Sequence, residues 1–272
     1  MIEIRCMDEW RAQRKTLTGS VGFVPTMGAL HAGHASLIEA SVARDDVTVL
    51  SIYVNPTQFN DPKDLASYPD TLADDLALAE RLGVDYVILP TYEDIYADGF
   101  RFQLDENQFS LELCGANRPG HFTGVLTVVM KLLNLVRPDR AYFGKKDYQQ
   151  YQLVSDMARA FFLDVEIVGC STVREADGLA MSSRNKLLDE KARCQAAMFN
   201  RELRSARCDE FVAERLARQG FEVDYIETRG ARRFGAVVVR SGDRCVRLID
   251  NVEVVEPLSA ANHNQPKLGI SA

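Results

Sequence analysis

The sequence predicts an α/β protein, in which a doubly wound, Rossmann-like parallel sheet is followed by a second, smaller α+β domain. Up to about residue 170, strand-like and helix-like stretches alternate, and the stretch at 47–55 is apolar enough for a strand buried on both faces. Beyond a loop at 174–185 the alternation stops. We therefore expect domains at residues 1–173 and 174–256.

The elements of the first domain follow from their periodicity and from Gly and Pro punctuation. Helices are expected at residues 8–17, 71–82, 125–136 and 147–161, and a further helix is expected around the apolar positions Leu37, Ile38, Val42 and Ala43. Strands are expected at residues 21–24, 47–55, 84–89, 139–143 and 165–168. This order of strands and helices favours a parallel sheet with right-handed crossovers.

The second domain has a different order of elements. Helices are expected at 189–207 and 209–219, and short strands at 223–228, 235–239 and 244–249. The tail at 257–272 is polar and rich in turn residues, so we expect it to be loosely ordered.

Composition excludes several classes of function. The formal net charge of −7 gives no basic field for binding nucleic acid. No apolar run is long enough for a membrane span, and the N-terminus lacks a leader pattern, so we expect a cytoplasmic protein. Six cysteines without a C-x-x-C pair are expected to be free, reduced thiols.

The stretch SVGFVPTMGALHAGH, residues 20–34, predicts a phosphate-binding site. A strand that runs through a tight turn into a helix directs backbone N–H groups and the positive end of the helix dipole at one point. His31 and His34 can donate hydrogen bonds there, and Gly33 allows a base or ribose to approach the backbone. The alternative is a pair of ordinary surface histidines. The H-x-G-H pattern resembles the signature of the nucleotidyltransferase superfamily.

Further polar clusters follow predicted strands. VNPTQF supplies the amides of Asn55 and Gln58, and FGKKDYQQ supplies Lys146 for a polyphosphate and Gln150 one turn further on. AMSSRN, residues 180–185, has the composition of a mobile clamp for departing phosphates. Each stretch could also be an ordinary polar turn, loop or helix start.

Three other positions allow two interpretations. Asp74 and Asp75 begin a helix, where they either complement its dipole or hold Mg²⁺. His121 shares a Gly- and Pro-rich loop with Arg118, and it could face a phosphate or organise that loop.

Six motifs in order, PTMGALHAGH, YVNPTQF, RPGHFTGV, PDRAYFGKKDYQQ, READGLAMSSRN and RLIDN, make the chain resemble the pantothenate synthetase family, also called pantoate–β-alanine ligases. The resemblance covers about residues 21–251. It implies that ATP and pantoate form a pantoyl adenylate with release of pyrophosphate. The amine of β-alanine then attacks the adenylate and gives pantothenate and AMP.

The resemblance also implies roles for individual residues. The catalytic set would be His34 as proton donor, with His31, Lys146, Ser182, Ser183 and Arg184. The ATP-binding set would be Met27, Gly28, Ala29, Leu30, His31, Ala32, Gly33, His34, Gly144, Lys145, Lys146, Asp147, Val173, Met181, Ser182, Ser183 and Arg184. Gln58 and Gln150 would bind pantoate, Gln58 would also bind β-alanine, and Mg²⁺ would lie near Asp74 or Asp75. A homodimer is expected as well.

Two departures from the family pattern bear on these roles. Position 145 is lysine where the family more often has glutamate, and its side chain is expected to point away from the site. Residues 186–239 match the family weakly, so the resemblance supports the expected closing motion of the second domain less than it supports the other roles.

Two alternative functions remain, namely a nucleotidyltransferase of the phosphopantetheine adenylyltransferase type and a non-catalytic nucleotide-binding protein.

Overall fold

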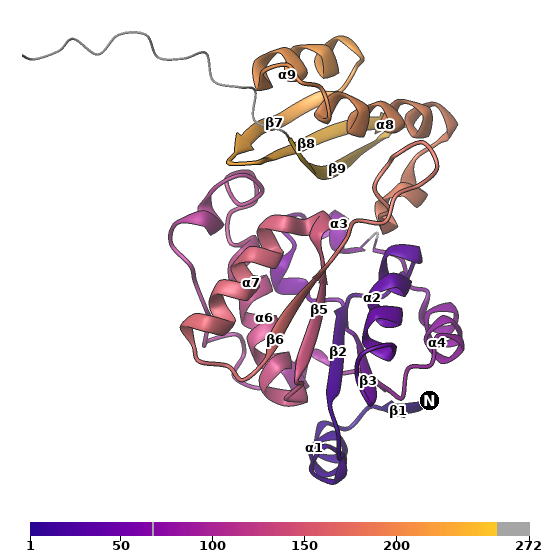
Figure 1. Ribbon diagram of the computed structural model, residues 1–272, viewed down its shortest axis with the longest axis vertical. Helices are drawn as coiled ribbons and strands as arrows, with labels where there is room; N and C mark the ends of the chain where they lie inside the picture. Colours follow the sequence, from indigo (N-terminus) through magenta and orange to yellow (C-terminus); the bar gives the residue numbers. More distant parts are fainter. Residues whose placement is uncertain (67, 255–272) are drawn as a thin grey trace, which may run out of the picture.

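The computed structural model describes residues 1–66 and 68–254, which form two sheets with their helices (Figure 1). The larger part contains β1 (Ile2–Ile4), α1 (Met7–Thr16), β2 (Val21–Thr26), α2 (Ala32–Val42), β3 (Val47–Ile52), η1 (Pro56–Gln58), α3 (Pro62–Ala66), α4 (Leu72–Arg81), β4 (Tyr86–Ile88), α5 (Tyr92–Ile95), η2 (Phe109–Leu111), α6 (His121–Val136), β5 (Arg140–Gly144), η3 (Lys145–Asp147), α7 (Tyr148–Ala160) and β6 (Glu166–Cys170). The smaller part contains η4 (Ser183–Leu187), α8 (Glu190–Leu203), α9 (Asp209–Arg218), β7 (Glu222–Arg229), β8 (Arg232–Ser241) and β9 (Arg244–Glu253). The expected tail at 257–272 lies outside the described residues.

The larger sheet is parallel and doubly wound. Its strand order is β1-β4-β3-β2-β5-β6, so the order reverses at β2, beside which both β3 and β5 pair. The smaller sheet is antiparallel, in the order β7-β8-β9. The predicted fold class is therefore confirmed. Crevices at such a switch point, outside the carboxyl ends of the strands, are where doubly wound sheets bind ligands.

The boundaries of several elements differ from the sequence-based ranges. The prediction omitted β1, which is only three residues long and owes its place to pairing with β4. Helix α6 begins at His121 rather than at 125, and α8 ends at Leu203 rather than at 207. Strands β8 and β9 are ten residues each, longer than expected, because they pair along their whole length. Pairing across a sheet is not visible in local periodicity.

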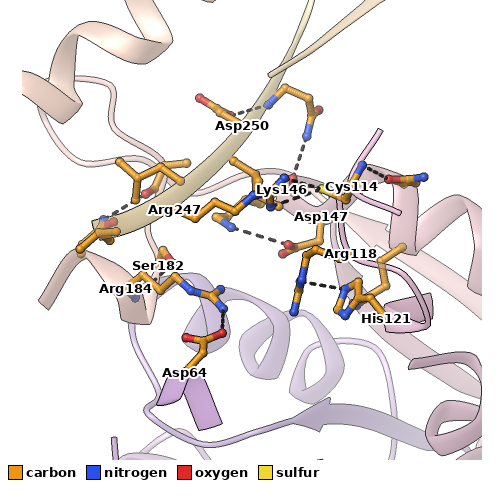
Figure 2. Close-up of a pocket in the computed structure, with 18 of the residues that line it drawn as sticks. Asp64, Cys114, Arg118, His121, Lys146, Asp147, Ser182, Arg184, Arg247 and Asp250 are labelled. Atoms are coloured by element: carbon orange, nitrogen blue, oxygen red, sulfur yellow. Dashed lines mark hydrogen bonds and ion pairs between the residues drawn. The ribbon is translucent and has the colours of Figure 1, made fainter. Parts of the chain in front are cut away.

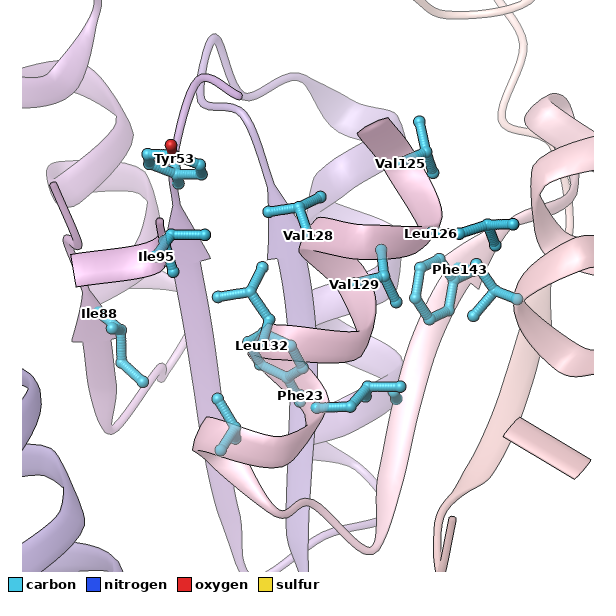
Figure 3. Packing of buried hydrophobic residues seen from close by; sticks show 14 of the residues in the cluster. Phe23, Tyr53, Ile88, Ile95, Val125, Leu126, Val128, Val129, Leu132 and Phe143 are labelled. Carbon is cyan, nitrogen blue, oxygen red and sulfur yellow. The ribbon is translucent and has the colours of Figure 1, made fainter. Parts of the chain in front are cut away.

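Hydrophobic side chains cover both faces of the larger sheet. On one face, α6 lays Val125, Val129 and Leu132 against the strands, close to Phe23 and Phe143 (Figure 3). On the other face, α2 and α4 bury a separate cluster that includes Ile38, Leu50 and Ala79. Burial on both faces explains why the central strands are apolar throughout.

The smaller part has its own core, in which α8 and α9 pack on the three-stranded sheet. Figure 1 shows this part beyond one end of the larger sheet. Two hydrogen bonds identify that end as the carboxyl end, because Asn251 Nδ2 in β9 donates to the carbonyl oxygens of Lys145 and Lys146, directly after β5. No helix within 1–66 or 68–254 has the length and apolar character needed to cross a membrane.

Candidate active site

The turn after β2 is held by a carboxylate from another element. Gly28 and Ala29 both adopt positive φ angles, 80° and 51°. The N–H groups of Ala29 and Leu30 donate to Asp75 Oδ2 and Oδ1 at 2.8 and 2.7 Å, and Thr71 Oγ1 donates to Oδ2 at 3.1 Å. The anion expected at these two N–H groups is thus the side chain of Asp75, which is buried.

This arrangement bears on the expected metal site. Both carboxylate oxygens of Asp75 already accept hydrogen bonds, so the structure gives Asp75 the task of holding the turn. Asp74 is exposed on the same helix. In the part of the chain that the structure describes, no three His, Cys, Asp or Glu side chains gather as a metal site.

His31 and His34 lie ring against ring, with centroids 4.2 Å apart. His31 caps α2, and its Nδ1 accepts the N–H of Gly33 at 3.1 Å. Burial lowers the pKa of His31 to about 4 and the pKa of His34 to about 3, with Lys146 adding to both shifts. Both rings are therefore neutral near pH 7. His34 Nδ1 is buried and has no hydrogen-bond partner among the described residues, so it is available to a ligand.

Gln58 is oriented by its neighbours in and before η1. Asn55 Nδ2 donates to Gln58 Oε1 at 3.1 Å and to the Gly124 carbonyl of α6 at 3.2 Å. Gln58 Nε2 lies 3.1 Å from Met27 Sδ. A small cavity of about 70 Å³ separates Gln58 from Gln150. Apolar and aromatic side chains complete its wall, namely Tyr53, Val125, Val128, Val129, Leu132 and Phe143.

A second cavity, of about 230 Å³, brings most of the predicted nucleotide residues together. It is lined by Met27, His31, Gly33, His34, Gln58, Gly144, Lys146, Asp147, Gln150, Val173, Met181, Ser182, Ser183 and Arg184, among others. Seven expected residues do not line it, namely Gly28, Ala29, Leu30, Ala32, Lys145, Asp74 and Asp75. The stem of Lys145 instead packs over Gly169 of β6, in line with the expectation that it points away.

The AMSSRN loop closes one side of this cavity. Ser182 Oγ accepts the N–H of Arg184 at 3.3 Å and so begins η4. Arg184 pairs with Asp64 of α3 at 3.0 Å, which joins the loop to the larger part (Figure 2). The Met181 N–H donates to the Val173 carbonyl at 3.0 Å, so the loop folds back on the segment after β6.

An outer cleft of about 640 Å³ adjoins this cavity, between β9 and the larger part. The linings of the two have seven residues in common, namely Arg118, His121, Lys146, Asp147, Gln150, Ser182 and Arg184. Sequence reasoning missed the contribution of β9 and of Tyr225 to this cleft. RLIDN was recognised only as a motif, and nothing in local periodicity places β9 opposite the strand ends.

The structure shows hydrogen bonds of the loop-organising kind at His121. Its Nδ1 donates to the Gln58 carbonyl at 2.9 Å, and its Nε2 accepts from Arg118 Nη1 at 3.1 Å. Burial and Arg118 lower the pKa of His121 to about 3, so the ring is neutral. His121 therefore organises the loop that carries Arg118.

Neutral imidazoles, a lysine and two glutamine amides thus meet where β2 and β5 end, at the switch point of a doubly wound sheet. This position and these donors suit an anionic nucleotide and a small polar substrate. The fold and the site together define a nucleotide-dependent α/β enzyme.

A family profile described as pantoate-β-alanine ligase matches residues 2–253, and the chain belongs to this family. A pantothenate synthetase from Bdellovibrio bacteriovorus is 51% identical over 251 residues, which cover 92% of this chain and 98% of that protein. One from Legionella pneumophila is 50% identical over 247 residues, 90% and 96% of the two chains. The chain is thus a ligase of pantothenate biosynthesis, as the resemblance implied, and the adenylyltransferase rival is set aside.

Solved structures with a similar fold also come from this family. A pantoate-β-alanine ligase from Francisella tularensis, crystallised with β,γ-ATP and β-alanine, has a TM-score of 0.86 and 38% identity, and the match covers 93% of this chain and 97% of that one. The enzyme from Thermus thermophilus gives a TM-score of 0.81 at 38% identity, over 93% and 99% of the chains.

Proposed function

We propose that this chain joins pantoate to β-alanine through an enzyme-bound pantoyl adenylate. The observation that carries the proposal is the continuity of the site. The cavity with His31 and His34 also contains Gln58 and Gln150, which in turn border the small apolar cavity. A nucleotide and a hydroxy acid would therefore meet in one enclosed space.

In the first step, a carboxylate oxygen of pantoate attacks the α-phosphorus of ATP, and the bond from that phosphorus to pyrophosphate breaks. Negative charge grows on the departing phosphates. His34, Lys146 and the Ser182 to Arg184 loop, which line the same cavity, would supply donors and positive charge for it. Because the imidazole of His34 is neutral, we assign it a hydrogen-bond donor role in place of an imidazolium acid.

The lining of the small cavity suits the apolar part of pantoate. That molecule has two methyl groups on one carbon, flanked by a carboxylate and two hydroxyl groups. Val125, Val128 and Leu132 offer an apolar wall for the methyl groups, while Gln58 and Gln150 offer amides for the polar ends.

In the second step, the neutral amine of β-alanine attacks the adenylate carbonyl carbon. A C–N bond forms, the bond from that carbon to the AMP phosphate oxygen breaks, and the proton of the amine passes to solvent. Adenylation is needed because AMP is a far better leaving group than an oxide ion.

Mg²⁺, homodimer formation and a cytoplasmic location complete the proposal. No three His, Cys, Asp or Glu side chains gather for the ion among the described residues, and Asp75 holds the turn after β2. Mg²⁺ would therefore arrive with ATP, held by phosphate oxygens, whose charge it neutralises.

We further propose that residues 174–256 act as a lid over the nucleotide.

Pantoate-dependent exchange of labelled pyrophosphate into ATP, measured without β-alanine, tests the adenylate route. We expect exchange with pantoate and none without it. Absence of exchange with pantoate would overturn the proposed route. The same assay tests the non-catalytic interpretation, which predicts no exchange under any condition.

Gln150→Ala tests the pantoate cavity. Losing the amide removes hydrogen bonds to pantoate, so its KM should rise about tenfold or more, with a smaller change in the KM for ATP. Steady-state kinetics with each substrate varied in turn gives both values. An unchanged KM for pantoate at an unchanged rate would mean that Gln150 has only a structural role.

A further inference from the structure

We propose that Arg118 binds the carboxylate of the amine substrate and so determines that the enzyme uses an amino acid instead of a simple amine. This inference rests on the proposed function, because it concerns the second substrate of the same site.

The first argument is that the arginines of the outer cleft differ in whether they have a carboxylate partner. Arg184 pairs with Asp64 at 3.0 Å, and Arg247 pairs with Asp224 at 2.6 Å. Arg118 is half-buried and close enough to both to feel their positive charge, and within 1–66 and 68–254 it forms no ion pair with a carboxylate. An unpaired guanidinium in a desolvated cluster of cations is costly unless an anion joins it.

The second argument is the number of donors that Arg118 keeps for a ligand. Its Nη1 donates to the neutral His121 ring at 3.1 Å, and its Nη2 donates to the Gln58 carbonyl at 3.1 Å. A guanidinium has five N–H donors. The remaining donors can bind the two oxygens of a carboxylate. The bond to His121, drawn in Figure 2, and the bond to the Gln58 carbonyl hold the guanidinium in position.

The third argument is position. Arg118 lines both the outer cleft and the inner cavity, and its bond to Gln58 places it at the pantoate end of the site. Once ATP and pantoate fill the nucleotide cavity, β-alanine has to arrive through the outer cleft. β-Alanine carries its carboxylate two carbons from its amine, so Arg118 can hold one end while the other reaches the adenylate.

Arg118→Met tests the proposal, because methionine keeps the apolar stem and removes the charge. We expect the KM for β-alanine to rise about 30- to 100-fold, as for a lost charge-assisted hydrogen-bond pair. Pantoate-dependent pyrophosphate exchange should fall far less than the use of β-alanine, since that step precedes β-alanine. Arg118→Lys should recover part of the affinity.

Substrate choice gives a readout that a merely structural role would not move. The wild type should greatly prefer β-alanine over 3-aminopropan-1-ol, which lacks the carboxylate, and Arg118→Met should bring the ratio of the two kcat/KM values close to one. Arg244→Met, which removes an exposed cation of the same cleft, is the matched control and should keep the preference.

Two outcomes would overturn the proposal. One is an unchanged KM for β-alanine in Arg118→Met. The other is a parallel loss of pyrophosphate exchange, which would assign Arg118 to the nucleotide or to the loop structure. Failure of exchange in the wild type would instead overturn the proposed function, so the two failures are distinguishable.

Discussion

His31 and His34 show at the scale of single residues how burial shapes this site. Both rings are shielded from water and face Lys146, so their pKa values fall to about 4 and about 3. A neutral imidazole can still donate a hydrogen bond to a phosphate oxygen. In the proposed function, the paired histidines would therefore serve as polar contacts for a ligand, and the positive charge would come from Lys146 and Arg184.

Replacing His34 or Lys146 by Ala should cut adenylate formation by two or more orders of magnitude. This corresponds to about 3 kcal/mol of lost transition-state stabilisation for each residue. Single-turnover formation of the adenylate is the appropriate measurement. Lys63→Ala, at an exposed cation of the outer cleft, is the control. Near-normal adenylate formation in either variant would contradict the role assigned to that residue.

The same histidines should make stability depend on pH. Their folded-state pKa values lie below the ordinary value of 6.5, so the unfolded chain binds protons first as the pH falls. The stabilising contribution of the two neutral histidines is therefore fully present above pH 6.5. As the pH falls from 6.5 toward 4, the free energy of unfolding decreases by about 1.4 kcal/mol per pH unit for each histidine.

Urea unfolding at several pH values checks this expectation. His34→Gln should reduce the dependence on pH between 6.5 and 4, because it removes one group that only the unfolded chain protonates. If the slope were the same in both proteins, the neutral state assigned to His34 would be wrong.

At the scale of elements, the contact between η1 and α6 sets the position of Gln58. A Cβ atom at Gly124 would lie 2.5 Å from the Thr57 carbonyl oxygen and 2.8 Å from the Gln58 nitrogen. Only glycine allows this approach, in which Asn55 also donates to the Gly124 carbonyl. The sequence-based helix at 125–136 excluded this glycine, because GHFTG has the composition of a loop.

Gly124→Ala should displace η1 and raise the KM for pantoate, with a loss of stability of about 1–3 kcal/mol from overpacking. At an unhindered helical position the same change stabilises a protein by about 1 kcal/mol, so the sign of the effect is diagnostic. Thermal unfolding and pantoate kinetics measure the two consequences. A more stable variant with normal kinetics would show that the close approach is unimportant.

At the scale of the whole molecule, β9 joins the two parts beside the nucleotide cavity. Asn251 donates to the carbonyls of Lys145 and Lys146, and the neighbouring Asp250 pairs with Arg174 at 2.7 Å. The segment that carries Lys146 is therefore fixed by hydrogen bonds from β9 of the smaller part. As the proposed lid, the smaller part would exclude water from the nucleotide site when it is closed.

Asn251→Ala should weaken this connection. Losing two hydrogen bonds, each worth about 0.5–1.5 kcal/mol, should raise the KM for ATP about tenfold and increase cleavage between the two parts in limited proteolysis. Asn134→Ala, at an exposed position on α6, is the control. Unchanged ATP kinetics would mean that β9 does not support the nucleotide site.

The sequence by itself determined the fold class and most of the first-domain elements, because buried parallel strands and amphipathic helices leave periodic patterns of apolar residues. It also carried the motifs that identify the family, since the turn after β2, Lys146 and the Ser182 to Arg184 loop are local runs of residues. These features depend on neighbours in the chain, which a sequence displays directly.

Only the tertiary structure decided which groups meet. The carboxylate of Asp75 accepts hydrogen bonds from N–H groups expected to face a ligand. Within the described part of the chain, Arg118 lacks the carboxylate partner that Arg184 and Arg247 each have. Hydrogen bonds and ion pairs between residues tens of positions apart follow from packing, and local periodicity contains no information about them. The same holds for the histidine pKa values, because burial is a property of the whole fold.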